Sequence, residues 1–373
     1  MPAYLDHAAT TPMRPEAVAA MLPFLTDQFG NPSGSHAWSR AARQAIEEAR
    51  DVVAACLGAR PGEVVFTGSG TEADNLALFG VHAVRGGTVV CTAVEHHAVL
   101  HSVQALGGRV TGVDGAGTVD LDALSDALDD TVSVVSVMLA NNEVGTVEPL
   151  DAVVAVVRER APGAVLHTDA VQAFPWVDVA ALAAGADLVA VAAHKFGGPK
   201  GVGALVVREG VKMAPLLHGG GQERDRRSGT HNVAGIVAMA AAMRATLEHR
   251  ADTVARIGPL RDRLVDGLLA AVEGSVETGD RARKIAGNAH VSFDGVESEA
   301  LLVLLDDVGV AASAGSACTS GAVEPSHVLE AMGVDRRRAL GALRLSLGWP
   351  STEADVELAL KAVPEAVAQL RSA

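Results

Sequence analysis

The residue with the clearest chemical potential is Lys195. An uninterrupted apolar run, residues 188–193, predicts a buried strand that ends just before it, and a glycine-rich turn follows at residues 197–199. A lysine at the end of a buried strand is partly desolvated, which lowers its pKa and makes its amine a candidate for Schiff-base chemistry. Taken alone, this stretch is equally compatible with a solvated lysine before a surface turn.

Three other polar features also follow predicted strands. A turn that ends in Gly70 and Thr71 leads into a predicted helix, and the free backbone N–H groups at such a helix start can bind a phosphate. Asp169 comes directly after a strand predicted at residues 164–168, and His96 follows a strand predicted at residues 89–94. Each feature alone is a weak signal, because many structural turns look the same.

Together with Lys195, these groups match the requirements of pyridoxal 5'-phosphate. This cofactor needs an anion site, a carboxylate that keeps the pyridine nitrogen protonated, a lysine that holds the aldehyde, and a ring to stack against. Two nucleotide-binding alternatives fit less well: no GxGxxG follows the first predicted strand, and the GSGT turn lacks the lysine of a Walker motif.

The three cysteines are Cys56, Cys91 and Cys318. They are too few and too scattered for a disulfide framework or a zinc site, so we expect no metal. Cys56 falls in the apolar pattern of a helix and Cys91 in a buried strand, which indicates inert core thiols. Cys318 lies among small and polar residues, which favours a reactive thiol.

Composition limits the classes of partner. The chain has 373 residues, of which 49% are hydrophobic and 20% charged, enough for a sizeable core and two domains. A net charge of −15 argues against nucleic acid as the main partner, because binding phosphates needs a basic face. The sequence contains neither a signal-peptide pattern nor an apolar run of about 18 residues that could cross a membrane. We therefore expect a cytoplasmic protein.

Predicted strands and helices alternate through the first two thirds of the chain. The strands are predicted at residues 63–67, 89–94, 132–139, 164–168 and 188–193. This alternation, with polar groups after the strands, is typical of an α/β protein with a mostly parallel sheet and a ligand site beyond the carboxyl ends of the strands.

The rest of the chain has a different character. Helices are predicted at residues 235–250 and 255–272, and the mixed strands and helices that follow favour a smaller α+β domain starting near residue 250. Residues 218–232 form a glycine-rich polar stretch that is long for a loop in a compact domain. Such loops are usually functional or belong to an interface.

Motifs along nearly the whole chain resemble one family. In order, they are YLDHAATTP, GNPSGSH, TGSGTEADNLAL, EHHAVL, NNEVGT, HTDAVQ, AHKFGGPKG, GGGQERDRRSGT, SAGSACTSGAVEPSHVL and LRLSLG. They are similar to the motifs of group I cysteine desulfurases of the NifS/IscS type, within the class V aminotransferases of fold-type I pyridoxal phosphate enzymes. The resemblance implies a large domain with a seven-stranded-type, mostly parallel sheet over residues 15–250, and a smaller α+β domain made of residues 1–14 and 251–373.

The resemblance also assigns the residues that would hold the cofactor. Lys195 would form the Schiff base and move the substrate Cα proton, and Asp169 would pair with the pyridine nitrogen. The other cofactor-binding residues that it implies are Gly70, Thr71 and His194 at the phosphate, Thr230 reaching in from the second subunit of a homodimer, His96 stacked on the ring, Gln172 at the ring hydroxyl, and Asn142 beside it.

For the substrate, the resemblance implies that Asn31 and Arg344 hold the carboxylate of L-cysteine. Cys318 would take the substrate sulfur as a persulfide, release L-alanine, and pass the sulfur to an acceptor protein of an iron–sulfur cluster or thio-modification pathway. A selenocysteine lyase, another class V enzyme, and a non-catalytic sulfur-transfer scaffold remain open as alternatives.

Three positions depart from the family pattern. Ala192 stands where many relatives carry a phosphate-binding serine, so one phosphate anchor is expected to be missing. Gln222 replaces a histidine of some members, and His7 stands where asparagine is frequent. None of the three alters the lysine or the proposed nucleophile.

Overall fold

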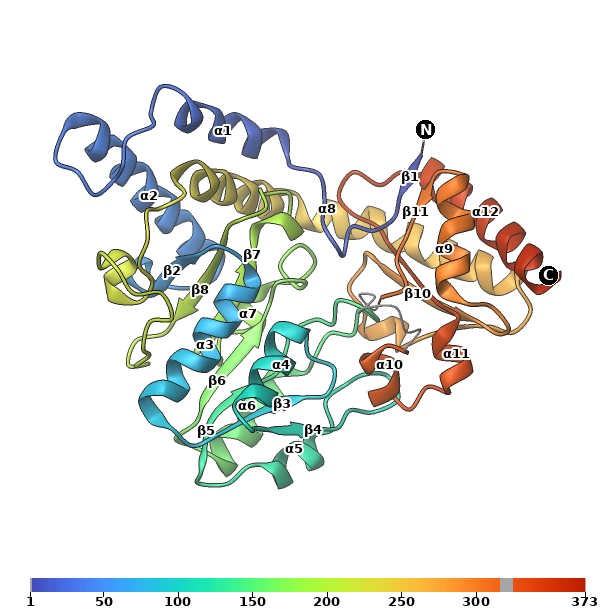
Figure 1. The fold of residues 1–373 in the computed structure, drawn as a ribbon. Coiled ribbons are helices and arrows are strands. Elements are labelled where there is room, and N and C mark those ends of the chain that lie inside the picture. The colour runs from blue at the N-terminus through green and yellow to red at the C-terminus, as the bar shows by residue number, and fades with distance from the viewer. Residues whose placement is uncertain (1, 316–324, 373) are drawn as a thin grey trace.

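The computed structural model describes residues 2–315 and 325–372. Within them, seven strands form a central sheet in the order β2-β8-β7-β6-β5-β3-β4 (Figure 1). The strands are β2 (Val64–Thr67), β3 (Thr88–Thr92), β4 (Arg109–Thr111), β5 (Val132–Ser136), β6 (Val165–Asp169), β7 (Leu188–Ala192) and β8 (Gly203–Val207). Neighbouring strands are parallel except at β8, which is antiparallel to both β2 and β7.

The apolar runs of the sequence form the middle of this sheet. Every residue of β5, β6, β7 and β8 is buried. Continuous burial of this kind is typical of a sheet that is covered on both faces. The predicted α/β fold with a mostly parallel sheet is therefore confirmed.

Helices precede the first of these strands, alternate with the parallel strands along the chain, and follow the last one as a short 3-10 turn. They are α1 (Pro15–Leu25), α2 (Ala37–Cys56), α3 (Gly70–Arg85), α4 (His97–Ala105), α5 (Leu121–Ala127), α6 (Leu150–Arg160) and α7 (Val179–Leu182), with 3-10 turns η1 (Pro61–Glu63), η2 (Ala193–Lys195) and η3 (Gln222–Asp225). In the view of Figure 1, α3 and α4 lie in front of the sheet. Helix α3 contacts β5, β6, β7 and β8. Its N-terminus lies at the carboxyl end of β7, because a Cβ on Gly70 would fall 3.3 Å from Cβ of Ala192, the last residue of that strand.

The C-terminal part forms a second body beside the sheet, on the right of Figure 1. Its small antiparallel sheet has the order β12-β10-β9. The elements are α8 (Val233–Ala271), β9 (Ser275–Glu277), η4 (Arg281–Arg283), β10 (Asn288–Phe293), α9 (Ser298–Asp307), β11 (Val310–Ala311), α10 (His327–Ala331), α11 (Arg336–Leu340), β12 (Ala342–Ser346) and α12 (Glu353–Ser372).

Helix α8 connects the two bodies and corrects one prediction. The sequence predicted separate helices at residues 235–250 and 255–272, but α8 is continuous over 39 residues. Helix α8 contacts α1, α2, α12, β9 and β10. Its first part lies beside α1 and α2 and its later part lies in the C-terminal body (Figure 1). No residue from 247 to 256 is buried, so the apolar pattern is interrupted where the helix changes partners although the backbone continues.

The N-terminal segment contacts both bodies: its first strand pairs with the C-terminal body, and the Thr11 amide donates to the His194 carbonyl of the large body. Strand β1 (Ala3–Tyr4) pairs in parallel with β11, and the Ala8 amide donates to Ser346 Oγ at 2.9 Å. This segment therefore passes between the two bodies (Figure 1). In the part of the chain that the structure describes, no helix is both long and apolar enough to cross a membrane.

Candidate active site

A cavity of about 430 Å³ opens beyond the carboxyl ends of the parallel strands. Its walls come from the N-terminal segment, the large sheet with its loops, and the C-terminal body. The lining residues are Ala8, Ala9, Ser69, Gly70, Thr71, Asp74, His96, Met138, Asn142, Asp169, Val171, Gln172, Ala192, His194, Lys195, Ser313, Gly315 and Arg344. Most of the predicted cofactor residues therefore meet at one place.

Lys195 lies in η2, directly after β7, as the sequence predicted. Its Nζ donates to the carbonyl oxygens of Ala8 at 2.6 Å and Ala9 at 3.0 Å. Burial lowers the pKa of Lys195 to about 8; Arg344 acts in the same direction, and Asp169 opposes it. The amine can therefore lose its proton near neutral pH, which both Schiff-base formation and proton transfer require.

Asp169 ends β6 and is buried in the cavity wall. One carboxylate oxygen accepts from the Val171 amide at 2.8 Å. Burial raises the pKa of Asp169 to about 6, and this effect exceeds the opposing effects of the Val171 hydrogen bond and Lys195. A cation placed against this carboxylate would favour its ionised form, so the position suits a protonated ring nitrogen.

The N-terminus of α3 offers an anion-binding turn made of Ser69, Gly70 and Thr71. Ser69 caps the helix by accepting from the Glu72 amide at 3.0 Å, whereas Gly70 and Thr71, as first helical residues, have no acceptor within the helix. A Cβ on Gly70 would fall 2.8 Å from Val171 Cγ2, so glycine permits the close approach of this turn to β6 and β7. Free N–H groups at the positive end of a helix suit a phosphate.

His96 caps α4 and presents a neutral ring to the cavity. Its Nδ1 accepts from the Ala98 amide at 3.1 Å, which leaves the ring proton on Nε2. Burial, with Lys195 as the next cause, lowers the pKa of His96 to about 4. A neutral, oriented imidazole is suited to stack on an aromatic ring.

Three other predicted cofactor residues line the cavity: Gln172, His194 and Asn142. Gln172 Oε1 is buried without a hydrogen-bond partner and could accept from a ring hydroxyl. His194 Nδ1 lies 3.3 Å from Thr10 Oγ1, and burial, followed by Lys195, lowers the pKa of its ring to about 4.

Arg344 reaches the cavity from β12 of the C-terminal body. Its Nη2 bonds Asp6 Oδ1 at 2.9 Å and its Nη1 donates to the Asn142 carbonyl at 2.9 Å, while its buried Nε has no partner. The guanidinium is thus fixed in place and still has a donor to offer, which suits a substrate carboxylate.

Two predicted residues do not line this cavity in the single chain. Asn31 is exposed after α1, where its Oδ1 accepts from the Ser33 amide at 3.0 Å, and Thr230 is exposed in the loop before α8. A third residue, Cys318, lies outside the described residues. The nearby Ser313 and Gly315 line the cavity. Cys56 and Cys91 are buried, as predicted, and burial raises the pKa of both thiols.

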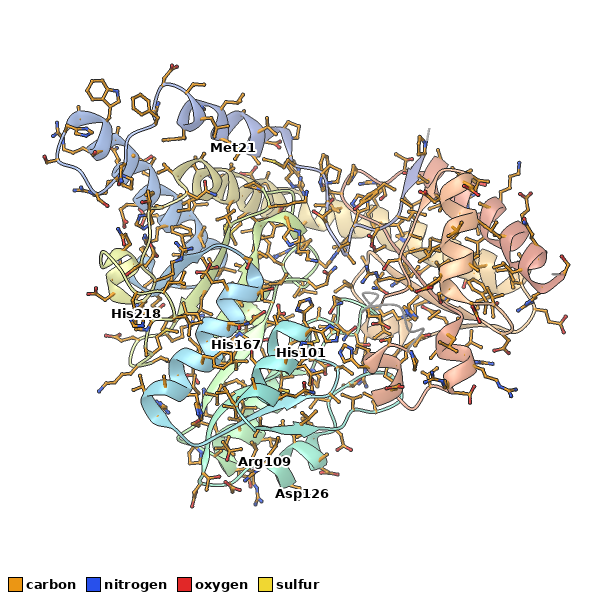
Figure 2. All side chains as sticks on the ribbon, viewed as in Figure 1. Met21, His101, Arg109, Asp126, His167 and His218 are labelled. Atoms are coloured by element: carbon orange, nitrogen blue, oxygen red, sulfur yellow. The ribbon has the colours of Figure 1, made fainter. Side chains whose placement is uncertain are left out.

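The sequence reasoning missed Asp74, which is buried in the cavity wall. Its Oδ1 lies 3.5 Å from Nε2 of the buried His167, labelled in Figure 2. Burial, with the nearby charge of Asp169 as the next cause, raises the pKa of Asp74 well above its usual range. The sequence held a signal for both residues. Asp74 stands one helical turn after Gly70, and His167 stands two positions before Asp169 on the same face of the strand, so each shares a face with a predicted site residue.

The cavity as a whole fits pyridoxal phosphate. It combines a free anion-binding turn, a buried carboxylate, a neutral imidazole, an unpartnered amide oxygen and a lysine with a lowered pKa. Among the described residues, no three His, Cys, Asp or Glu side chains are grouped to hold a metal ion.

Comparisons with known proteins agree with this geometry. Residues 3–359 match the family model described as aminotransferase class-V. An IscS-like cysteine desulfurase of Mycobacterium tuberculosis is 50% identical, with 100% of this chain and 98% of that protein covered. The cysteine desulfurase IscS of Methanosarcina thermophila is 43% identical over 99% of this chain and 93% of its own. A solved NifS-like protein superimposes with a TM-score of 0.92 at 36% identity, covering 99% of this chain and 100% of that one. The chain therefore belongs to the aminotransferase class-V family, among the cysteine desulfurases of the IscS and NifS type.

Proposed function

We propose that this protein is a pyridoxal-phosphate-dependent cysteine desulfurase that converts L-cysteine to L-alanine and transfers the sulfur to Cys318. The observation that carries the proposal is the single cavity in which Lys195, Asp169 and the anion-binding turn at Gly70 meet Arg344 from the other body. The full-length similarity to cysteine desulfurases supports the same reaction rather than a selenocysteine lyase or a silent scaffold.

Eight residues of the cavity wall would hold the cofactor. Gly70, Thr71 and His194 would bind its phosphate, Asp169 its ring nitrogen, His96 its ring face, Lys195 its aldehyde carbon and Gln172 its ring hydroxyl, with Asn142 beside it. When bound, pyridoxal phosphate would supply an electron sink for negative charge at the substrate Cα. After the substrate amine takes the place of Lys195, the freed Lys195 amine would move the Cα proton. A group whose pKa is about 8 is suited to this task.

Arg344 would orient the substrate through its carboxylate. The ion pair with Asp6 keeps the guanidinium at the cavity wall, and the unpartnered Nε provides a donor that the substrate can use. Asn31 is proposed as a second carboxylate ligand on the strength of its motif alone.

Cys318 would act as the sulfur acceptor. Its thiolate would attack the substrate sulfur, so that a sulfur–sulfur bond forms, the Cβ–sulfur bond breaks, and the carbon fragment takes up a proton to become alanine. The persulfide sulfur would then pass to a thiol of an acceptor protein.

A second copy of the chain would complete the site. Thr230 is exposed and outside the cavity of its own chain, so a contact with the phosphate requires a homodimer. Large apolar side chains exposed on and near α1 and α2, including Leu25, Phe29 and Trp38, offer surface for such an interface. We also propose the division into residues 15–250 and residues 1–14 with 251–373, and the cytoplasmic location that the sequence favours.

Replacing the lysine tests the proposal. Lys195→Ala should abolish both the visible absorbance that cofactor gives the purified protein and the formation of alanine from cysteine. The exposed Lys212→Ala is the matched control and should retain both. Alanine formation at the wild-type rate by Lys195→Ala would refute the cofactor assignment.

A further inference from the structure

The loop of residues 218–232, which carries Thr230, contains a strained turn. Glu223, Arg224 and Asp225 have φ values of 50°, 57° and 63°, and they are consecutive residues with side chains in the left-handed region. A Cβ makes this conformation unfavourable, so a run of three persists only where the surroundings impose it. The contacts of the loop show what imposes it.

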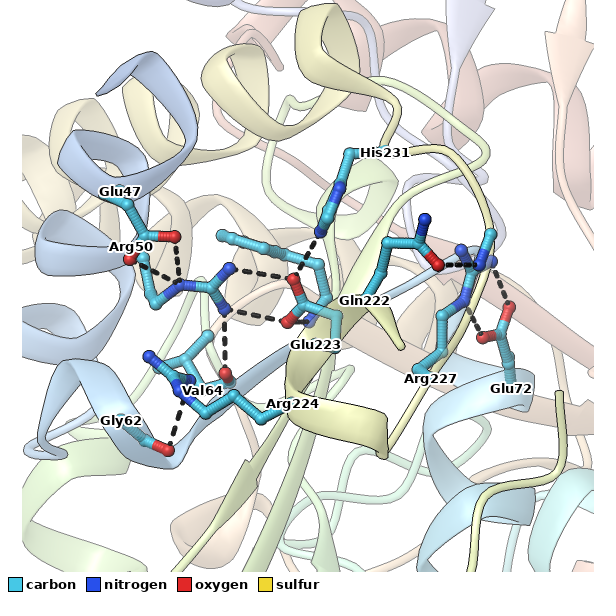
Figure 3. A network of polar contacts seen from close by, with 12 residues as sticks. Glu47, Arg50, Gly62, Val64, Glu72, Gln222, Glu223, Arg224, Arg227 and His231 are labelled. Atoms are coloured by element: carbon cyan, nitrogen blue, oxygen red, sulfur yellow. Dashed lines mark hydrogen bonds and ion pairs between the residues drawn. The ribbon is translucent and has the colours of Figure 1, made fainter. Parts of the chain in front are cut away.

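The first anchor is the buried carboxylate of Glu223 (Figure 3). Arg50 of α2 binds it with two hydrogen bonds of 2.8 Å, one from Nη1 and one from Nη2, and the Phe66 amide of β2 donates to it at 2.9 Å. His231 Nε2 lies 2.7 Å from the same carboxylate. Glu223 is 5% exposed and Arg50 3%, so water does not compete for these bonds.

The second anchor joins the loop to the anion-binding turn. Arg227 Nε donates to Glu72 Oε1 at 2.7 Å, and Nη2 donates to Oε2 at 3.2 Å (Figure 3). Glu72 is the residue directly after Gly70 and Thr71, and its Oε2 also accepts from the Gly68 amide at 2.8 Å. The loop is therefore attached to Glu72 on one side of this turn, and Glu72 in turn binds Gly68 on the other side.

The ion pair between Arg227 and Glu72 also affects the charge beside the anion-binding turn. An unpaired Glu72 carboxylate would repel an anion bound at the neighbouring N–H groups, and Arg227 neutralises it. The pair therefore connects the position of the loop with the electrostatics of the turn.

We propose that Arg50, Glu223, Glu72 and Arg227 are positioning residues that hold the loop of residues 218–232 rigidly against the anion-binding turn and thereby determine how firmly the cofactor phosphate is retained. None of the four lines the candidate active-site cavity. The proposal rests on the proposed function only for the identity of the ligand, because the rigidity of the loop can be measured without cofactor.

Two variants test it, with one control. Glu223→Gln and Arg227→Gln each remove one charge of an anchor, and Glu209→Gln removes one charge of the exposed Arg60–Glu209 pair. The first readout is the rate at which purified holoenzyme loses pyridoxal phosphate on dialysis. We expect at least tenfold faster loss for both anchor variants, and no change for the control. The double variant should be no worse than the more severe single one, because both anchors hold the same loop.

The second readout is trypsin cleavage of the cofactor-free protein after Arg224 and Arg226. Both anchor variants should be cut faster than the wild type at these arginines. The melting temperature of Arg227→Gln should stay close to that of the control. If Glu223→Gln fails to fold because Arg50 is left buried and unpaired, Arg227→Gln decides alone, since its ion pair is partly exposed.

The outcomes separate the two proposals. Folded variants with wild-type cofactor loss and wild-type cleavage would overturn the positioning role, as would losses that add in the double variant. A wild-type protein that binds no pyridoxal phosphate would refute the proposed function, and faster cleavage of the variants would still support the anchors. Thr230→Val with unchanged cofactor loss would remove the proposed role of Thr230 and leave the anchors standing.

Discussion

Replacing Glu143 with glutamine should stabilise the protein at high pH and leave its stability at low pH nearly unchanged. Glu143 is 2% exposed. Its Oε2 accepts from Ser326 Oγ at 2.7 Å, while its Oε1 has no hydrogen-bond partner and lies 3.9 Å from Nε2 of the buried His290. Glutamine keeps the shape and the acceptor for Ser326 but cannot ionise.

The magnitude follows from the pKa of this carboxyl. Burial raises the pKa of Glu143 from 4.5 to about 7, against the smaller opposing effects of Ser326 and Arg344. A raised pKa means that the folded state prefers the neutral carboxyl. The neutral carboxyl therefore contributes its full stabilisation below the unfolded pKa, and this stabilisation is lost as pH rises through about 7. Each pKa difference of one corresponds to about 1.4 kcal/mol, so ionisation of the buried group costs about 3 kcal/mol at alkaline pH.

The assay is reversible urea unfolding of both proteins in the same cofactor state, at about pH 4, below the unfolded pKa of the carboxyl, and at about pH 8.5. The variant should match the wild type at the lower pH and exceed it by about 3 kcal/mol at the higher one. The exposed Glu248→Gln is the control and should show no such pH dependence. A stability difference between Glu143→Gln and the wild type that is the same at both pH values would refute the assignment of a neutral buried carboxyl.

Three other changes should have defined effects. Ala192→Ser places a hydroxyl in the cavity wall and should slow the loss of cofactor on dialysis. A hydrogen bond from this hydroxyl to a charged group would contribute at most about 1.5–3 kcal/mol. An unchanged rate of loss would mean that another group already binds the phosphate at this place. Asp225→Gly relieves a φ of 63° and should raise the free energy of unfolding by about 0.5–1 kcal/mol, so a destabilised variant in urea titrations would argue that the aspartate is not strained. Mixing subunits of Lys195→Ala with subunits of Thr230→Val should restore activity, because mixed dimers contain one intact site if Thr230 acts across the interface; no recovery after verified subunit exchange would place Thr230 in its own subunit's site or make it dispensable.

Much of the fold and several cavity-lining residues could be predicted, because local signals specify them. The apolar run before Lys195 and the strand before Asp169 are buried on both faces, so their sequences carry a strong pattern, and residues at the carboxyl ends of neighbouring parallel strands must meet. The anion-binding turn at Gly70 was predictable for the same reason, since a glycine-rich turn followed by a helix is a local feature.

Long-range contacts explain what could not be predicted. The Asp6–Arg344 ion pair joins residues that are 338 positions apart, and no local pattern indicates it. The spacing of Asp74 from Gly70 places it on the cavity side of α3, but its contact with His167 depends on the packing of α3 on β6. The continuity of α8 was hidden because the helix changes its packing partners near residue 250, so its apolar face is interrupted.

The most direct test of the account is the reaction of Cys318→Ala with L-cysteine. In the proposed mechanism, cysteine binds through Asn31 and Arg344 and displaces Lys195, and none of these steps uses the thiol. Addition of cysteine should therefore still change the visible spectrum of the holoenzyme. The sulfur would then have no acceptor, and the variant should form neither alanine nor a protein persulfide at a meaningful rate, while the wild type forms both. Alanine release by Cys318→Ala near the wild-type rate would contradict the account, because it would mean that the carbon–sulfur bond breaks without a persulfide and that the enzyme is a lyase.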